Sequence, residues 1–192
     1  STGSTYGARY VGRSKKPVTG DLYASPTGSG TTCTEAAPCT FAQALTLATA
    51  TPGSHIWMLN GTYNLTSTIT IPPSTYIEAC NPKQAIIDFG NGSRKVYFSA
   101  TSDNSTLRNL VIQRSSTYGV QVEKGNNNKF IGLVLRENSG GGFALENNDV
   151  YSVWSTTGTA PNDYSPQATT TADGNNNIII DTVAYFNNEC TN

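Results

Sequence analysis

Hydrophobic positions recur along this chain in blocks that lie 23 residues apart. Residues 107–112 carry apolar side chains at the same places as residues 130–135, and residues 119–123 match residues 142–146 at the same spacing. Two blocks that share one offset indicate an internal repeat. Such repetition is typical of folds that stack one structural unit on the next.

Each repeat has the pattern of strands and turns. Its segments are short and alternating, contain β-branched or aromatic residues, and are separated by Gly, Asn and Ser. One such unit cannot bury its apolar face alone, whereas stacked coils place equivalent side chains about 4.8 Å apart. The pattern predicts an all-β parallel β-helix. Its inward columns would pair Leu107, Leu110 and Ile112 with Phe130, Leu133 and Leu135 of the next coil.

A further copy of the pattern lies near the C-terminus. Residues 174–185 restate residues 125–135 at an offset of 49 or 50, which is about two periods. The Asn runs at 126–128 and 175–177 are expected at turns, because Asn tolerates left-handed backbone angles and its amides can stack in ladders. Residues 151–173 show no clear periodicity and are expected to form an irregular loop or coil.

Residues 33–50 are expected to cap the N-terminal end of the stack. Phe41, Ala44, Leu45 and Ala48 lie at helical spacing. A short helix here would cover an end that otherwise exposes apolar core and unpaired backbone groups to water.

Short motifs upstream of the repeats indicate the first coils. They are a Pro-Gly pair at 52–53, a Gly-Thr-Tyr turn at 61–63, and apolar segments at 69–73, 76–79 and 85–88. Their order resembles the opening of the pectate-lyase-like right-handed parallel β-helix superfamily. The resemblance covers residues 21–192 and implies a single right-handed parallel β-helix domain. Together with the short N-terminal capping helix, the chain has room for about six coils.

The resemblance also implies a chemistry. Members of this superfamily that cleave acidic polysaccharides by β-elimination use a Lys or Arg base, often with Ca²⁺ held by acidic residues in a long groove. The basic residues available here are Arg108, Arg114, Lys129 and Arg136. No family catalytic motif maps onto them, and about six coils leave less room for a groove. Arg114 also shares its register with Glu137, which predicts an ion pair between coils.

Three acidic residues form a candidate Ca²⁺ site. Glu123 and Glu146 share a register and Asp149 follows closely, so two carboxylates one coil apart would repel unless a cation lies between them. The alternative is that they point outward and are screened by water and Lys124. No other cofactor is predicted. His55, the single histidine, has no second His or Cys at metal spacing and is interpreted as a structural or surface residue.

Composition and charge exclude several classes of protein. Only 13% of the 192 residues are charged, and 12 basic residues stand against 13 acidic ones, so the basic footprint of a nucleic-acid binder is missing. The apolar runs are far shorter than the roughly 20 residues that a membrane-spanning helix needs.

Several features predict a secreted or cell-surface protein. The chain begins at Ser1 without a charged-then-apolar leader, as expected after removal of a signal peptide. Sequons occur at Asn60, Asn64, Asn91 and Asn104, and each is either a glycosylation site or an unmodified turn residue.

Four cysteines allow three pairings. Cys33 and Cys39 flank a short loop, and a local disulfide is the simplest arrangement. Cys80 and Cys190 are then four to five periods apart, or about 20 Å in a regular stack, which is too far for a disulfide. Either both are free, or Cys190 meets a cysteine of the next subunit, or the 151–173 segment carries the chain back.

Residues 1–20 form a basic N-terminal arm outside the repeat. It contains Arg9, Arg13, Lys15 and Lys16 and no acidic residue. The arm either docks onto a neighbouring body of opposite charge or is a flexible terminus.

Two functions remain open, and the sequence favours the first. One is a secreted structural or adhesive protein that stacks head to tail, using the arm and the cysteines Cys80 and Cys190 for self-association. The other is a carbohydrate-active enzyme, a polysaccharide lyase on acidic glycans. Glycan binding without cleavage lies between them.

Overall fold

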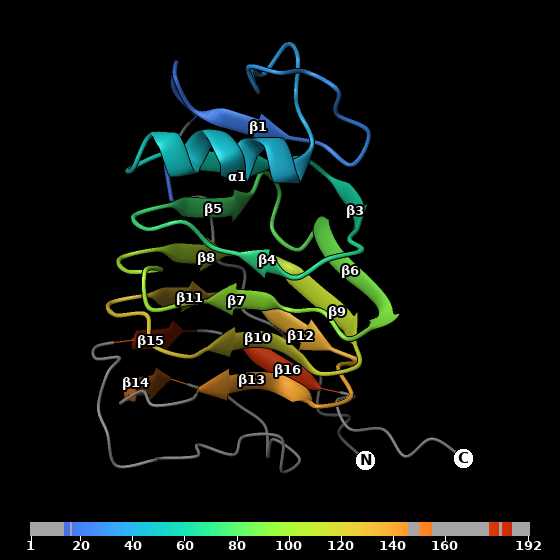
Figure 1. Ribbon diagram of the computed structural model, residues 1–192, viewed down its shortest axis with the longest axis vertical. Coiled ribbons are helices and arrows are strands. Elements are labelled where there is room, and N and C mark those ends of the chain that lie inside the picture. The colour runs from blue at the N-terminus through green and yellow to red at the C-terminus, as the bar shows by residue number, and fades with distance from the viewer. Residues whose placement is uncertain (1–13, 16, 146–149, 155–176, 181, 186–192) are drawn as a thin grey trace, which may run out of the picture.

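The computed structural model describes residues 14–15, 17–145, 150–154, 177–180 and 182–185. They form a column of stacked strands with one helix across its N-terminal end (Figure 1). Three sheets, named A, B and C here, run along the column, and every strand pairing within them is parallel.

The strands divide among the three sheets as follows. Sheet A contains β1 (Leu22–Ala24), β2 (His55–Met58), β5 (Tyr76–Ala79), β8 (Thr106–Arg108), β11 (Lys129–Ile131), β14 (Val150–Trp154) and β15 (Asn177–Ile180). Sheet B contains β3 (Gly61–Asn64), β6 (Ala85–Gly92), β9 (Val111–Ser115), β12 (Val134–Arg136) and β16 (Val183–Tyr185). Sheet C contains β4 (Ile69–Thr70), β7 (Val96–Phe98), β10 (Tyr118–Val122) and β13 (Gly141–Leu145).

The predicted parallel β-helix is confirmed, although it has fewer coils than expected. Within the described residues, four coils contain a strand in each of the three sheets, from β2 through β13, against the six expected. Strand β1 precedes them, and β15 and β16 form part of a further coil. The expectation was too high because the cap and residues 155–176 contribute no described strand.

The 23-residue repeat is confirmed as one turn of the helix. Phe130 pairs with Leu107 in sheet A, Leu135 pairs with Ile112 in sheet B, and Phe143 pairs with Val120 in sheet C. Leu110 and Leu133 are fully buried between these strands. Phe98, Phe130 and Phe143 pack edge to face up the centre of the column, with ring centroids 5.0 and 5.3 Å apart.

Each of the four described coils has three strands, and one corner between strands lies inside the repeated block. The block 107–112 is a bend between two strands, because Asn109 has φ 60° and turns the chain from sheet A into sheet B. Gly132 has φ 62° at the equivalent place one coil later. The strands on both sides of this left-handed residue direct their apolar side chains into the core. The apolar pattern therefore continues across the corner and gives no sign of it.

The C-terminal copy of the repeat lies one coil from its match, and the two-period interpretation is wrong. Strand β15 pairs directly with β11, with Ile179 opposite Phe130. Strand β14 precedes β15 in the chain but pairs on its far side, so the later strand lies between β11 and the earlier one. Of the stretch without periodicity, residues 151–154 belong to β14, and 155–176 lie outside the described residues.

Asparagines occupy the turns between sheets C and A, as predicted for 126–128. Asn127 has φ 54°, and its side-chain amide donates to Asn104 one coil earlier over 3.2 Å. The Asn128 side chain accepts from the Ser105 N–H, and the Asn177 side chain accepts from the Asn128 N–H, both over 2.9 Å. These bonds use backbone donors that a turn leaves unpaired.

Helix α1 (Phe41–Ala50) closes the N-terminal end, as predicted. Its buried residues are Phe41, Ala44, Leu45 and Ala48, the four at helical spacing. The Thr40 hydroxyl accepts from the Gln43 N–H over 3.1 Å and caps the first turn.

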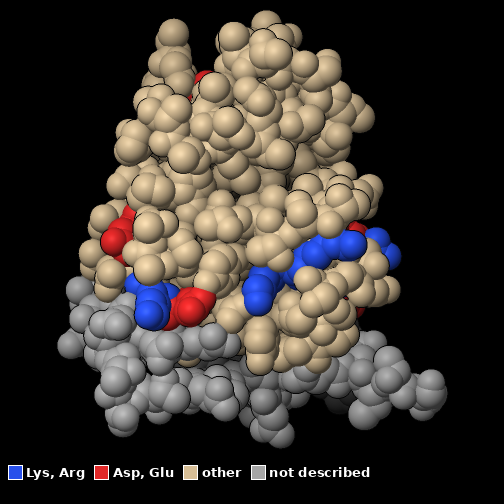
Figure 2. Space-filling model, viewed as in Figure 1, with Lys and Arg blue, Asp and Glu red and all other residues tan. Residues whose placement is uncertain are grey.

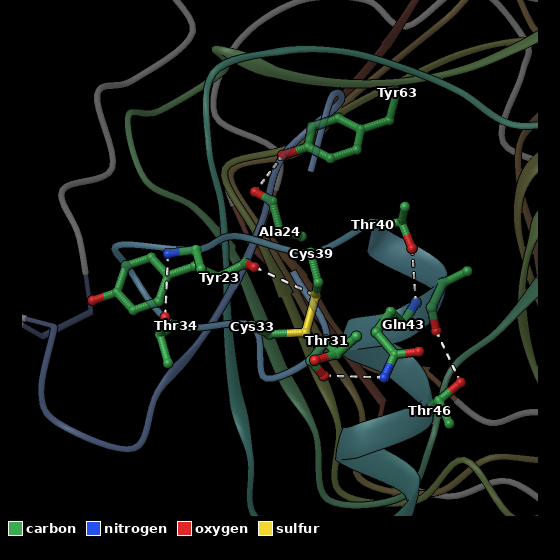
Figure 3. Close-up of a disulfide and its surroundings, with 12 residues drawn as sticks. Tyr23, Ala24, Thr31, Cys33, Thr34, Cys39, Thr40, Gln43, Thr46 and Tyr63 are labelled. Atoms are coloured by element: carbon green, nitrogen blue, oxygen red, sulfur yellow. Dashed lines mark hydrogen bonds between the residues drawn. A yellow bond between two sulfur atoms is a disulfide. The ribbon is translucent and has the colours of Figure 1, made fainter. Parts of the chain in front are cut away.

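The predicted bridge between Cys33 and Cys39 is present beside the helix (Figure 3). Both cysteines are fully buried, and the backbone of Cys39 pairs in parallel with that of Ala24 at the end of β1, as an isolated β-bridge. The Tyr63 hydroxyl lies 2.8 Å from the carbonyl oxygens of Ala24 and Leu59, which joins β1 to the first coil. Burial raises the pKa of Tyr63 strongly, so its hydroxyl stays protonated and remains a donor to these two carbonyl oxygens.

Candidate functional site

A ladder of polar side chains runs across the outer face of sheet B. Asp88, Gln113 and Arg136 stand opposite one another on β6, β9 and β12. The Gln113 amide donates to Asp88 over 2.7 Å, and Arg136 Nε donates to the Gln113 carbonyl oxygen over 2.7 Å. Each rung belongs to a different coil, so the ladder follows the long axis of the helix.

Arg114 joins the ladder from the end of β9. Its Nε lies 2.8 and 2.9 Å from the two carboxylate oxygens of Asp88, and its Nη2 lies 2.7 Å from Asp88 Oδ2. The shared register predicts Glu137 as the partner of Arg114, but the ion pair is with Asp88 of the preceding coil. The side chain of Arg114 is 41% exposed while that of Asp88 is 2% exposed, so the guanidinium faces solvent above a buried carboxylate.

The charges of this pair are held fixed. Burial acts to raise the pKa of the Asp88 carboxyl, yet hydrogen bonds from Arg114 and Gln113 outweigh burial and lower that pKa. The same hydrogen bond to Asp88 raises the pKa of Arg114. Arg114 therefore stays positively charged at neutral pH and cannot serve as a proton acceptor there.

Two further basic residues, Arg94 and Lys95, come directly before β7, and Arg94 Nη1 donates to the Phe89 carbonyl oxygen over 3.2 Å. The Ser115 hydroxyl, next to Arg114, donates to the Arg94 carbonyl oxygen. Lys95 Nζ lies 5.8 Å from the centroid of the Tyr97 ring. Arg94, Lys95, Arg114 and Arg136 are called the cationic strip below.

The cationic strip spans three successive coils, and its four side chains are all part-exposed. In Figure 2, basic side chains lie in two groups across the lower half of the described surface, with acidic side chains next to the group on the left, whereas the upper coils show almost no charge.

A second polar cluster lies on the outer face of sheet A. Trp57, Glu78 and Arg108 stand opposite one another on β2, β5 and β8. Glu78 is fully buried, with Arg108 Nε 3.4 Å from Oε1 and His55 Nε2 3.5 Å from Oε2. The His55 ring is stacked between the rings of Trp57 and Tyr76, with centroid distances of 4.4 and 4.7 Å.

The N-terminal segment covers this second cluster. The Ser14 N–H donates to Glu78 Oε1 over 2.9 Å, and the Ser14 hydroxyl donates to Oε2. Asp21 accepts from Trp57 Nε1 over 2.8 Å and from Lys15 Nζ over 2.8 Å. Burial acts to raise the pKa of Asp21, but hydrogen bonds from Lys15 and Trp57 outweigh it and lower that pKa.

Of the three residues of the predicted Ca²⁺ site, the structure describes Glu123 alone. Glu123 is half-buried and accepts a hydrogen bond from the Tyr97 hydroxyl, while Glu146 and Asp149 lie outside the described residues. In the described part of the chain, no three His, Cys, Asp or Glu residues come together as metal ligands would. No step of a reaction is therefore derived through Ca²⁺.

The remaining predicted residues are dispersed. The sequon residues Asn60, Asn64, Asn91 and Asn104 are all exposed. Cys80 is half-buried after β5. Of the predicted assembly residues, Arg9, Arg13, Lys16 and Cys190 lie outside the described residues, and Lys15 pairs with Asp21 of its own chain. None of the helices described here is long and apolar enough to cross a membrane.

Sequence reasoning missed Asp88, Glu78 and Asp21. Asp88 precedes its rung partner Gln113 by 25 residues and Glu78 follows Trp57 by 21, so neither stands out at a spacing of 23. A search that allowed each coil its own length would have aligned both. No repeat covers Asp21, because it lies before the first coil.

Comparison with known proteins points to one family. The family model described as "Pel9A-like, right handed beta helix region" matches residues 22–192. The crystal structure of pectate lyase Pel9A is similar with 20% sequence identity and a TM-score of 0.45, over 65% of this chain and 44% of that one. The chain thus spans less than half the length of that lyase. No curated protein matches it.

Proposed function

The chain belongs to the Pel9A-like right-handed β-helix family, and from this premise we propose that it is a carbohydrate-active protein that binds a linear anionic polysaccharide. The observation that carries the proposal is the cationic strip. It presents Arg94 and Lys95 on one coil, Arg114 on the next and Arg136 on the one after.

The spacing of the cationic strip suits a polyuronate. Coils succeed one another every roughly 4.8 Å, which is about the length of one sugar unit along an extended chain. Basic groups on three successive coils can therefore meet carboxylates on three successive sugars. Arginine is suited to this role because its planar guanidinium matches a carboxylate with two parallel hydrogen bonds.

The ladder holds the strip in position. Arg114 is fixed by three contacts to Asp88, and Arg136 by its bond to Gln113. Side chains that are already ordered lose less conformational entropy when a ligand binds. The Tyr97 ring beside Lys95 offers an apolar surface at the edge of the strip.

Cleavage by β-elimination is a second candidate on the same surface, and family membership favours it. In that reaction a base removes the proton beside the uronate carboxylate while a positive group stabilises the charge that develops. The raised pKa of Arg114 suits it to stabilise charge. The described residues assign no group as the base.

An extracytoplasmic location accompanies the proposal. A buried disulfide between Cys33 and Cys39 persists most readily in an oxidising compartment, and that is where polymers of cell walls and matrices are met. Stacking of chains into filaments stays a prediction, which particle size measured over a range of concentrations tests.

Binding of polygalacturonate by the double variant R114A/R136A tests the proposed function. Each exposed Arg–carboxylate contact contributes up to about 1 kcal/mol, so we expect affinity about tenfold weaker. K129A is the matched control, because it removes an exposed positive charge from sheet A and leaves the strip intact. Unsaturated products that absorb ultraviolet light distinguish cleavage from binding.

Two results would overturn the proposal. One is equal affinity of the wild-type chain for polygalacturonate and for a neutral galactan. The other is an affinity for polygalacturonate that K129A weakens as much as R114A/R136A does. Thermal unfolding of each variant checks that the fold is retained.

A further inference from the structure

The segment before the first coil lies across the outer face of sheet A and is held there at two points. Ser14 binds Glu78 at one end, and Asp21 binds Trp57 at the other. The ion pair between Lys15 and Asp21, 2.8 Å long, ties the two ends together. The described residues of 14–21 are called the strap below.

The body of the protein leaves Glu78 incompletely bonded. Arg108 and His55 approach its carboxylate at 3.4 and 3.5 Å, whereas Ser14 of the strap donates to both oxygens at hydrogen-bonding distance. His55 Nε2 is buried and has no hydrogen-bond partner among the described residues, although it faces Glu78. Leaving a buried polar atom unpaired is costly, so this surface has bonding capacity that the strap does not fully meet.

Polar contacts hold the strap down. Val18, its largest apolar side chain, is 55% exposed, and Ser14 and Lys15 are exposed as well. Each of these hydrogen bonds replaces a hydrogen bond to water, so its net contribution to holding the strap is modest. A ligand that makes the same bonds can therefore displace the strap.

The hydrogen bonds that the strap makes indicate which donor groups a ligand needs in order to replace it. Ser14 presents two donors, an N–H and an O–H, to the two oxygens of one carboxylate, and two adjacent sugar hydroxyls present the same pair. Release of Asp21 would also free Trp57 Nε1–H to donate to a sugar oxygen. The Glu78 carboxylate repels anions, so a neutral sugar fits and a uronate does not.

We propose that the outer face of sheet A around Glu78, Trp57 and His55 is a binding site for adjacent hydroxyls of a neutral sugar, and that the strap is its displaceable occupant. This site lies on a different face from the cationic strip and takes a ligand of different charge. A branched or mixed polymer could thus be held at two places by different chemistries.

Tryptic cleavage after Lys15 measures release of the strap. A ligand that binds only when the strap is released shifts the equilibrium toward the released strap, and the size of this shift follows from the free energy of ligand binding. We expect neutral oligosaccharides from cellulose, xylan and galactan, tried separately at millimolar concentration, to include one that accelerates cleavage severalfold. Oligogalacturonate should not accelerate it, and in E78Q the neutral sugar should no longer do so.

Affinity measured by calorimetry separates a binding site from a structural contact. S14A removes a strap bond and leaves the site intact, so we expect about fivefold tighter binding of the neutral sugar. E78Q and W57F also loosen the strap but remove groups of the site, so binding should weaken. S139A is the matched control, a loss of an exposed serine hydroxyl elsewhere, and should change nothing.

The proposal is overturned if none of the three neutral sugars binds S14A, or if S14A and E78Q change sugar affinity in the same direction. Failure of E78Q to fold would be detected by circular dichroism, and W57F then provides the comparison. Binding of polygalacturonate is measured on the same samples, so this proposal and the proposed function can fail separately.

Discussion

The outer faces of sheets A and B carry similar ion pairs but differ in their exposure to solvent. On each face a buried carboxylate pairs with an arginine of the next coil, Glu78 with Arg108 and Asp88 with Arg114. On sheet A the strap covers the pair, and Arg108 is 16% exposed. On sheet B no described segment covers it, and Arg114 is 41% exposed.

This difference shows that two separate properties of the chain decide whether the polar side chains of a face can contact a ligand. The coil register determines which side chains share a column. Segments outside the repeat determine whether that column meets solvent. A ladder on sheet B can contact a polymer directly, whereas the column on sheet A is available only after the strap has moved.

The largest expected effect would break both faces at once. Phe130 is fully buried and packs between Phe98 and Phe143 in the core behind all three sheets. F130A should lower the free energy of unfolding by about 3–5 kcal/mol, because it leaves a cavity that the rigid stack cannot close. Urea denaturation measures the change. V18A, at an exposed position, is the control and should stay within about 0.5 kcal/mol of wild type.

A smaller effect should fall on sheet A alone. The Cys33–Cys39 disulfide supports β1, which pairs with β2 beside Trp57. The C33S/C39S variant should be less stable by about 2 kcal/mol, since a short loop gives modest entropic stabilisation. Hydrogen exchange should quicken in β1 and stay unchanged in β9 and β12. Equal loss of protection in both sheets would show that the two faces are not independent.

The smallest effect concerns acid and should appear on both faces. Asp21 and Asp88 have lowered pKa values in the folded protein. Each therefore stabilises the fold above its unfolded pKa of about 4, and that contribution is lost as pH falls through the folded value. Urea midpoints at a series of pH values should fall below about pH 4. D21N and D88N should each flatten the curve, and an unchanged curve in both would contradict the assignment.

The sequence predicts the core columns well because the coils from β8 to β13 have equal lengths. Leu107 under Phe130 and Ile112 under Leu135 follow from one offset. The corner at Asn109 was hidden, since a left-handed residue between two short strands does not disturb the apolar pattern. The cap helix was predictable because its apolar spacing is local and needs no register.

The polar columns were harder to predict because they depend on coils of unequal length. Asp88 and Gln113 are 25 residues apart and Glu78 and Arg108 are 30 apart, so no single period aligns them. The contact between Ser14 and Glu78 joins a segment outside the repeat to one inside it. A contact of that kind depends on tertiary packing, for which periodicity contains no signal.

The order of strands at the C-terminal end has a consequence for biosynthesis. Strand β15 lies between β11 and β14, although β14 leaves the ribosome first. The edge of β11 must therefore stay vacant while 22 further residues between the two strands are translated. If β14 paired with β11 early, that pairing would have to break before β15 could take its place. Folding of this coil is therefore expected to be slow in the nascent chain.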